Sequence, residues 1–523
     1  MEKNETLALV KGWYEAALLH PAVQAWREEA RLAWDFYDGS QWAPEEVAKL
    51  AELGQPAIVI NKIAAKIDNI AGTEVAGRTR LVFRSRSGNA REEQAAQVLS
   101  DLMTYVAERA ELPHEVSQVF RAGLVSGIGW LDVGVAEGAA GPEIFIRAED
   151  EMSVVWDPLA CAADLSDARF IARERWLDEA GVRQVFPEQA AAVLAALRQT
   201  GLPLRLGGWQ QGGQEVAYHD ERRGLFRIVE VQHKATVKHW QVQHLNGRIT
   251  SHSNRAEARK EAAGSIGAQL MGVVWVPQVK ATYFAGETLL ASHVLEEANG
   301  SFTLLPYVYK RHKADGRPYG LVRGAIDPQR ELNKRRSKAM HLLNTAQVIA
   351  DIDAVEDPAV LAREAARPDG LILKRAGKDL RIIRNADLAS SQVAVMEQAG
   401  RDIQDVLGVF DDNMGKPTQA ISGAAIQQRQ LAGTLNQMFA FDALRRLKKA
   451  LGGQLLALMR QTMTPTQVLR ITDNLSAARL AQVGLNNADW ASMFDVVVEE
   501  VGEVVSAREL AILQTQRPDL IGA

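Results

Sequence analysis

The chain has 523 residues, which is too long for one ordinary hydrophobic core and predicts three or four structural units at ~150 residues each. Its 60 basic and 65 acidic residues give a net charge of -5. This balance argues against a protein that grips nucleic acid tightly, but not against one that DNA merely slides past. The single cysteine, Cys161, excludes an intrachain disulfide and a cysteine-based zinc or iron–sulfur site, and it fits a reducing compartment.

The N-terminal residues predict helices around one polar turn. Apolar spacings of three and four predict a helix over residues 5–35, and no secretion signal or membrane span is expected. The turn "FYDGSQWAPEE", at residues 36–46, gathers three aromatics, and "GQPAIVINKI" follows at residues 54–63. A short helix is expected between them, beginning at Pro44 and ending before Gly54. Such stretches are typical of a catalytic loop, a ligand clamp or a subunit contact, and they leave the three open.

Residues up to about 326 predict an α+β body. "SGIGWLDVGV" turns through Gly127 and Gly129 into a strand, and from residue 143 to about 305 strands dominate. Helices are expected at about 114–124, 178–198 and 254–270. A capping box of Asn89 and Glu92 precedes another helix, whose expected buried stripe consists of Ala95, Leu99, Leu102, Val106 and Ala110.

Two helices with a small insert between them follow. "DPQRELNKRRSKAMHLLN", at residues 327–344, carries five basic and two acidic residues, and a second helix returns from Ser390. The insert, at about 346–385, reads strand, helix, strand, strand, with "LILKRA" at residues 371–376 as the second strand. The pattern therefore predicts a helical hairpin with a βαββ unit at its tip. The face expected to be shared on the first helix consists of Leu332, Arg336, Ala339, Met340 and Leu343.

A polar loop at 410–423 leads into the longest predicted helix. Apolar residues step by threes and fours over residues 422–462, with no proline in that range. At ~1.5 Å per residue this helix spans roughly 60 Å, a length typical of a strut in an assembly. A strand, "DVVVEEV", and a final helix, "SARELAILQTQ", close the sequence.

The sequence contains none of the common catalytic, cofactor-binding or metal-binding motifs. No Walker A loop, dinucleotide fingerprint or nucleophile elbow occurs, so no enzyme, catalytic residue or cofactor is predicted. The spacing of His233, His239 and His244 does not favour a metal site. The loop from Asp411 lacks the glutamate that would complete a calcium site. The basic helix at 327–344 is equally typical of a subunit contact and of a DNA-facing surface.

Three aspartates support an alternative hypothesis, in which the chain is a metal-dependent enzyme. Asp157, Asp164 and Asp167 lie close in sequence, as paired carboxylates do in metal-dependent DNA-processing enzymes. Aspartates that form ordinary turns and caps explain the same pattern, and this interpretation is favoured.

Four blocks of sequence, in order, resemble one family. These are "FYDGSQW" with "GQPAIVINKI", "VVWDPLACAADLSDARFI", "PYGLVRGAIDPQRELNKRRSKAMH" and "ISGAAIQQRQLAGT", and they extend from about residue 30 to 445. Together they resemble the portal proteins of tailed double-stranded DNA phages, in the branch typified by the P22 portal. One departure is that little more than 60 residues follow Leu458, so the resemblance implies a short C-terminal crown.

The resemblance implies a portal fold and a structural role. The expected assembly is a ring of about twelve copies at one capsid vertex in the virion, put together in the host cytoplasm. Double-stranded DNA would pass through the ring during packaging and ejection. The expected partners are the terminase large subunit, a head-completion or tail adaptor protein, and the major capsid and scaffolding proteins, with no membrane partner. The implied parts are a wing (1–326), stem helix one (327–345), a clip (346–387), stem helix two (388–409), a channel loop (410–423), a long spine helix with its return to the wing (424–500) and a crown segment (501–523).

The resemblance also implies roles for particular residues. The expected channel-loop residues are Asp411, Asp412, Asn413, Met414 and Lys416. The expected stem and intersubunit residues are Arg330, Lys334, Arg335, Lys338, Glu397, Asp402 and Asp405. The expected partner-docking residues of the clip are Asp357, Arg363, Arg367 and Lys374. In this context "FYDGSQW" is expected to be wing framework or intersubunit packing.

Overall fold

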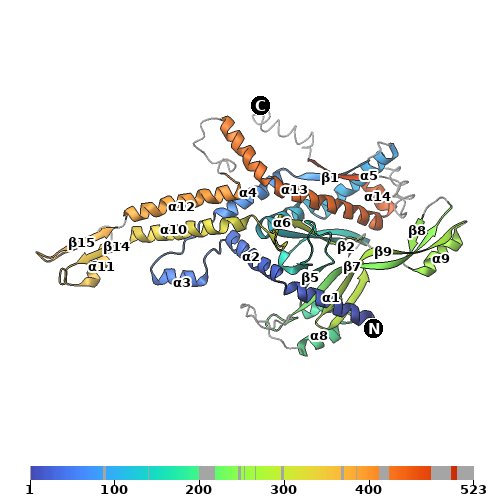
Figure 1. Cartoon of the computed structure of the whole chain (residues 1–523), viewed down its shortest axis with the longest axis horizontal. Coiled ribbons are helices and arrows are strands. Elements are labelled where there is room, and N and C mark those ends of the chain that lie inside the picture. Colours follow the sequence, from blue (N-terminus) through green and yellow to red (C-terminus); the bar gives the residue numbers. More distant parts are fainter. Residues whose placement is uncertain are drawn as a thin grey trace.

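The computed structural model describes residues 2–502, except 86–89, 139–140, 200–217, 246–248, 253, 266, 296–299, 367–369, 385, 411–422 and 473–495. The architecture is α+β and rich in helices, as the sequence predicts. The molecule is elongated: a hairpin of two long helices projects from a larger body and has a small unit at its far end (Figure 1).

The N-terminal helix predicted over 5–35 is in fact two helices, α1 (Glu2–Leu18) and α2 (Pro21–Asp38). Proline lacks the backbone N–H and pushes the preceding residue out of the helical region. His20 is accordingly extended, and its Nδ1 accepts a hydrogen bond from the Ala22 N–H at 3.2 Å. The short helix α3 (Pro44–Glu52) and the helix α4 (Lys62–Ala76) follow.

A small sheet and two helices build the centre of the body. The strand order is β11 (Leu304–Val308), β2 (Ile128–Gly138), β3 (Gly141–Glu149), all antiparallel. Helix α5 (Ala90–Arg109) buries its predicted stripe except Ala110, which is half-buried, whereas Asn89 lies outside the described residues. Helix α6 (Leu112–Ser126) passes into β2 through Gly127, as predicted. Gly127 has a φ of +94°, in the left-handed region, and a Cβ there would lie 2.4 Å from the Tyr319 backbone.

A larger antiparallel sheet forms the other side of the body. Its main path is β10-β9-β7-β5-β4, with β6 and β8 paired to β7. The long strands β7 (Leu225–Gln243) and β9 (Gln269–Ala285), with β5 (Phe170–Leu177), lie in the region at 143–305 where strands were expected to dominate. The remaining elements are β4 (Val154–Trp156), β6 (His219–Asp220), β8 (Ile249–His252), β10 (Thr288–Val294), α7 (Glu179–Val185), α8 (Ala190–Gln199), α9 (Arg255–Gly264) and the 3-10 turn η1 (Glu151–Ser153).

Short elements lead from the body into the projecting hairpin. They are β12 (Lys310–Arg311), β13 (Pro318–Tyr319) and the 3-10 turn η3 (Val322–Ala325). The hairpin consists of α10 (Ile326–Asn344) and α12 (Ala386–Leu407). At its tip lie β14 (Ala346–Ala350), α11 (Pro358–Ala366) and β15 (Leu380–Arg384).

The C-terminal part returns to the body. The predicted long helix is α13 (Gly423–Thr462), and its residues Leu444, Leu447, Leu451, Leu455 and Leu458 are buried in the main core. Helix α14 (Pro465–Thr472) packs near α5, and β16 (Val496–Gly502) pairs antiparallel with β1 (Thr79–Ser85). The predicted final helix lies outside the described residues. Within the described ranges, every helix is too short or too polar to cross a lipid bilayer.

Candidate functional site

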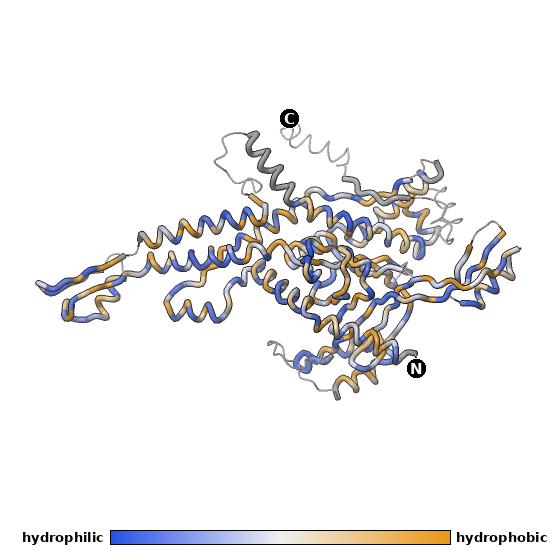
Figure 2. The backbone as a smooth tube through the Cα atoms, viewed as in Figure 1, coloured by the Kyte–Doolittle hydropathy of each residue, from blue (hydrophilic) through white to orange (hydrophobic). Residues whose placement is uncertain are grey.

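The hairpin is held together by a close antiparallel contact of α10 and α12. Leu332 and Ala339 of α10 are buried, as are Ala399 and Ile403 of α12. A Cβ at Gly400 would lie 3.9 Å from the Leu332 side chain, which is an ordinary van der Waals contact between the two helices. Hydrophobic and hydrophilic residues alternate along both helices (Figure 2), so each has a face to bury and a face to leave exposed. Leu343, which was expected on the shared face, is 61% exposed because the helices run beyond the body there.

A polar stripe on α10 binds the extended segment that precedes α4. The buried side chains Gln329, Asn333 and Ser337 are spaced by four residues and share one side of the helix. The backbone N–H of Lys62 donates to Gln329 Oε1 at 3.1 Å. The N–H of Ile60 donates to Asn333 Oδ1 at 3.1 Å, and that of Ile58 donates to Ser337 Oγ at 3.2 Å.

The spacing of these contacts follows from the geometry of the two elements. Every second residue of an extended chain advances ~6.6 Å, and every fourth residue of a helix advances ~6 Å. An extended segment antiparallel to α10 therefore meets one polar side chain at each alternate N–H. Gln329 Nε2 also donates to the Ile60 carbonyl at 2.7 Å, which completes the pairing at its centre.

The aromatic turn at 36–46 is anchored to the same stripe. Asn333 Nδ2 donates to Gln41 Oε1 at 2.6 Å, and Gln41 Nε2 donates to the Phe36 carbonyl at 2.7 Å. Trp42 Nε1 donates to the Ile58 carbonyl at 3.0 Å and so closes the base of the loop that carries α3. These side chains therefore help to hold the body to the hairpin, as framework residues do.

Three of the expected basic residues of α10 have partners within the chain. Arg330 lies 3.5 Å from Asp327, and Arg335 lies 3.1 Å from Glu331 and donates to Gln392 of α12 at 3.2 Å. Lys334 Nζ lies 2.8 Å from Glu46 of α3. A hydrogen bond from Lys334 lowers the pKa of the Glu46 carboxyl.

The other expected charged residues of the hairpin are Lys338, Glu397, Asp402 and Asp405. Lys338 is exposed and makes no ion pair with the described residues. On α12, Glu397 and Asp405 are likewise exposed without a partner among the described side chains, and Asp402 accepts a hydrogen bond from Gln398 at 2.8 Å. Lys338 is thus the exposed cation among the expected residues of α10, and the acids of α12 are accompanied by Arg401, which donates to Gln398 at 2.8 Å.

The tip is a two-stranded ribbon with one helix, not the predicted βαββ unit. Strand β14 pairs antiparallel with β15, and α11 contacts β14. Residues 371–375 have no strand partner, because Leu371 and Leu373 are exposed and the segment packs on no sheet face. The expected docking residues are Asp357, whose carboxylate accepts the Ala359 N–H at 2.8 Å, and the exposed Arg363 and Lys374. Arg367 lies outside the described residues.

The residues expected to form the channel loop lie outside the described part of the chain. Asp411, Asp412, Asn413, Met414 and Lys416 all fall within residues 411–422, outside the described residues. Its flanks are α12, which ends at Leu407, and α13, which begins at Gly423.

The three aspartates of the alternative hypothesis organise their own loop. Arg169 holds Asp157 through contacts of 2.6 and 3.0 Å, and Asp157 also accepts the Leu159 N–H at 3.1 Å. Burial raises the pKa of Asp157, but the hydrogen bonds from Arg169 and the backbone outweigh it, so the net pKa is lowered. Asp167 accepts the N–H groups of Cys161 and Ala162 at 2.6 and 3.0 Å. Turn and cap formation therefore accounts for these carboxylates.

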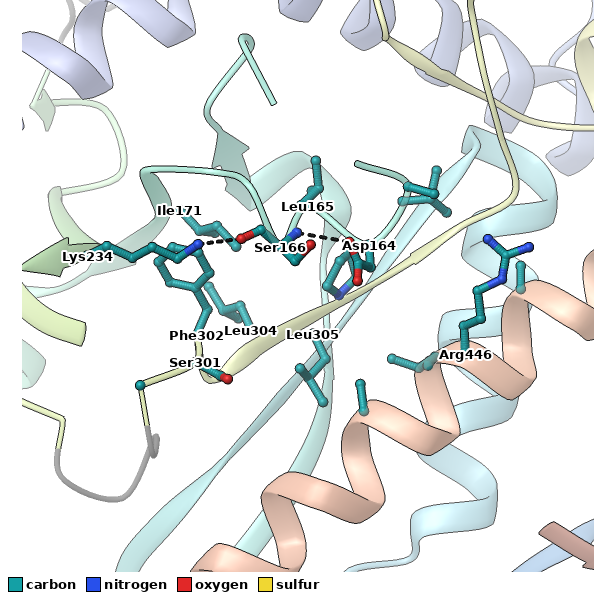
Figure 3. A pocket seen from close by; sticks show the side chains of 17 residues that line it. Asp164, Leu165, Ser166, Ile171, Lys234, Ser301, Phe302, Leu304, Leu305 and Arg446 are labelled. Atoms are coloured by element: carbon teal, nitrogen blue, oxygen red, sulfur yellow. Dashed lines mark hydrogen bonds between the residues drawn. The ribbon is translucent and has the colours of Figure 1, made fainter. Parts of the chain in front are cut away.

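A pocket of about 270 Å³ lies beside Asp164. Figure 3 shows the Asp164 carboxylate accepting the Ser166 N–H, with Lys234 donating to the Ser166 carbonyl and Arg446 projecting from α13 nearby. Asp164 is the one carboxylate among its lining residues, against the two cations Lys234 and Arg446. One carboxylate beside two cations is a poor setting for a divalent cation, because the positive charges of Lys234 and Arg446 repel it. Within the described part of the chain, no group of three or more His, Cys, Asp or Glu residues is arranged to hold a metal ion.

A buried charge cluster that the sequence did not reveal joins the two sheets. Arg173 of β5 donates to Glu149 of β3 at 2.9 Å, to Glu230 of β7 at 2.5 Å, and to Asp132 of β2. Burial raises the pKa of Asp132 even though Arg173 opposes the shift. The sequence predicts strands in this region. Which of their charged residues meet depends on how the two sheets pack.

Comparison with known proteins places the chain in a family. The family model described as "Phage P22-like portal protein" matches residues 11–513. No curated protein matched the chain.

Proposed function

The chain belongs to the phage P22-like portal proteins, and we propose that it forms a ring at one capsid vertex through which double-stranded DNA is packaged and ejected. The match over residues 11–513 carries this proposal. The architecture supports it: a slender helical hairpin with a small tip projects from a broad α+β body. The role is structural, and the ring has about twelve copies, arranged head to tail as cyclic symmetry requires.

The parts of the chain divide this work. The wing is residues 1–326, the stem helices are 327–345 and 388–409, and the clip is 346–387. The channel loop is 410–423, the spine and its return to the wing are 424–500, and the crown segment is 501–523. The terminase large subunit docks on the clip during packaging and a tail adaptor replaces it afterwards, while the capsid and scaffolding proteins surround the wing. Assembly takes place in the host cytoplasm, and the mature ring is part of the virion.

The charges of the hairpin suit neighbouring copies in a ring. Lys338 is exposed on α10, whereas Arg330 and Lys334 already pair within the chain. On α12, Glu397 and Asp405 are exposed, with Arg401 between them. In a head-to-tail ring two different surfaces of adjacent copies meet, so opposite charges on α10 and α12 favour contact. Arg335 contributes from within its own copy by bridging α10 to Gln392 of α12.

The experiment that tests this function is an image of the purified chain together with its native mass. We expect closed rings with a central hole and a mass near twelve copies of the 57.3 kDa chain. A magnesium-dependent nuclease assay on the same preparation is expected to show no DNA cleavage. A monomer that cleaves DNA would overturn the portal function and support a DNA-processing enzyme.

A further inference from the structure

The strands β7 and β9 continue beyond the large sheet as a two-stranded ribbon. Their other partners, β5 and β10, stop pairing with them at His233 and Lys280, and the far end of the ribbon carries β8 and α9. In Figure 1 this end lies opposite the projecting hairpin. We call residues 234–281 the arm. They include seven basic and two acidic residues, a net charge of +5 in a chain of -5, so the rest of the chain carries -10.

Helix α9 supplies three of the basic residues of the arm. Arg255, Arg259 and Lys260 are exposed and form no ion pair with the residues that the structure describes. Arg255 and Arg259 are four residues apart and therefore share one side of the helix. The acids Glu257 and Glu261 are also four residues apart, on another side. The helix thus has a basic side that no acid of its own chain neutralises.

A histidine–carboxylate cluster fixes α9 on one face of the ribbon. Glu261 Oε1 lies 3.1 Å from His244 Nε2, and the other carboxylate oxygen contacts His252 of β8. Ala258 of α9 and Val242 of β7 are both fully buried, and the two elements are in contact. The cations of α9 are therefore held at a fixed place on the arm.

The same face of the ribbon carries an exposed aromatic ring. Trp240 lies opposite His252, whose imidazole contacts α9, so Trp240 is on the face that α9 covers. Lys238 and Trp275 are the cross-strand pair two residues nearer the body, and they share that face. Trp275 is 57% exposed, unlike the other described tryptophans, and Lys238 Nζ lies 4.9 Å from the centroid of its ring.

The length of the ribbon separates these charges from the acids of the body. Residues 234–243 rise ~3.3 Å each, so the end of β7 lies roughly 30 Å from the sheet. The Debye length is about 8 Å at physiological ionic strength. Acids of the body therefore reduce the attraction of α9 for a polyanion very little.

We propose that the arm is a contact surface for double-stranded DNA, separate from the channel. The inference rests on the proposed function for the identity of the polyanion, because that function brings double-stranded DNA to the ring. The unpaired cations of α9 would bind phosphates and release counterions. Trp275, with Lys238 over its ring, offers a flat, charged surface to the sugars and bases. An excess of seven basic over two acidic residues is typical of a DNA-binding surface, whereas surfaces that bind proteins are less positively charged.

Closed circular duplex DNA tests the surface, because a closed circle cannot thread a preformed ring. Its binding to rings of the full chain is measured between about 50 and 200 mM salt. We expect Arg255→Gln/Arg259→Gln to raise the Kd about tenfold and to reduce the salt slope by about 2. Arg222→Gln/Lys313→Gln removes the same charge from exposed positions of the body and is the matched control, with a Kd expected within about twofold of wild type. All four residues are exposed, so the thermal midpoints should not change.

A competitor then distinguishes DNA from an acidic protein partner. Poly-L-glutamate at matched charge should displace the circle about tenfold less effectively than unlabelled duplex DNA, and Trp275→Ala should weaken binding of the circle but not of poly-L-glutamate. Equal displacement by the two polymers would overturn DNA as the occupant and indicate an acidic protein surface.

The inference and the proposed function fail in different ways. Intact rings that do not bind the circle, or that bind it equally well with Arg255→Gln/Arg259→Gln, would overturn the arm as a DNA surface and leave the portal function standing. Failure of the wild-type chain to form rings would overturn the portal function, and the same binding series on the monomer would then decide the role of the arm separately.

Discussion

Asn333 is the side chain through which the N-terminal segment and the aromatic turn are both attached to α10. It accepts the Ile60 N–H and donates to Gln41, while its neighbours on the stripe hold the residues on either side. The sequence predicted a helix here but assigned its buried face to apolar positions. Gln329, Asn333 and Ser337 recur every four residues. This regular polar spacing indicates a second buried face of the helix, which the apolar pattern alone does not reveal.

Replacing Asn333 with leucine is expected to destabilise the body–hairpin junction. The substitution leaves the Ile60 N–H and the Gln41 amide without their partner, which costs about 1–3 kcal/mol for a buried polar group. The thermal midpoint should fall, and proteolysis between residues 43 and 57 should accelerate. Lys338→Ala, an exposed change on the same helix, is the control and should shift the monomer's midpoint little. Equal midpoints for Asn333→Leu and wild type would show that the stripe does not support the junction.

His233 is expected to make the body sensitive to acid. It is buried on β7 against the Trp13 ring, whose centroid is 6.2 Å away, and it pairs across strands with Phe170 and Lys280. Burial lowers the pKa of His233, and the positive charge of Lys280 lowers it further. The folded state therefore holds this histidine neutral at a pH where the unfolded chain already binds a proton.

The sign of the effect follows from that difference in proton binding. Stability is expected to fall as the pH drops below about 6.5, by at most about 1.4 kcal/mol per pH unit for one group. The loss continues until the pH reaches the lowered pKa of the folded state. Thermal midpoints measured at pH 7.5 and 5.5 should differ more for wild type than for His233→Gln. An equal acid sensitivity of the two proteins would exclude His233 as the cause.

At the scale of elements, the sequence predicted helices better than the strands of the tip. The long helix α13 was recognisable because its leucines repeat over 40 residues, and its burial follows from the same pattern. The segment at 371–376 has the apolar composition of a strand, yet strand formation needs a neighbour that supplies hydrogen bonds. Composition cannot reveal that β14 takes β15 as its partner instead. Pro21 marks the break between α1 and α2. Apolar spacings of three and four continue across it, and for that reason a single helix was predicted.

Removing residues 357–374 tests the clip as a docking element. The deletion takes away α11 and the exposed segment that carries Leu371 and Leu373, but leaves the buried residues of the stem and wing untouched. We expect soluble rings that no longer bind the terminase large subunit and no longer support packaging in vitro. Ring formation, checked by native mass, is the internal control for folding. Normal terminase binding by the shortened ring would place the docking surface elsewhere.

At the scale of the whole molecule, distant parts of the chain meet in the body, to which the base of the hairpin is attached while its far half projects. Strand β16 pairs with β1, and α13 packs against the central sheet, so residues near both ends stabilise one core. A body closed in this way keeps its shape while the hairpin projects from it. The order of the parts was predictable from the family resemblance, whereas the β1–β16 pairing depends on a contact across more than 400 residues that no local pattern records.

The last prediction concerns the loop at 410–423, which we propose converges on the axis of the ring. The acids Asp411 and Asp412 would repel the DNA backbone, and Lys416 would offer only a weak, salt-sensitive contact, so DNA would slide without sticking. The net charge of -5 is consistent with such a conduit.

A cysteine at position 413 tests this placement, with Cys161→Ala in the same chain because Cys161 is exposed and would react as well. In filled particles we expect Asn413→Cys to crosslink to DNA or to neighbouring copies and to resist a bulky thiol reagent. The unmodified chain, whose Cys161 lies on the body, is the control for reagent access. Free reaction of the residue-413 thiol with the bulky reagent, together with no crosslink to DNA, would place the loop on the outside of the ring.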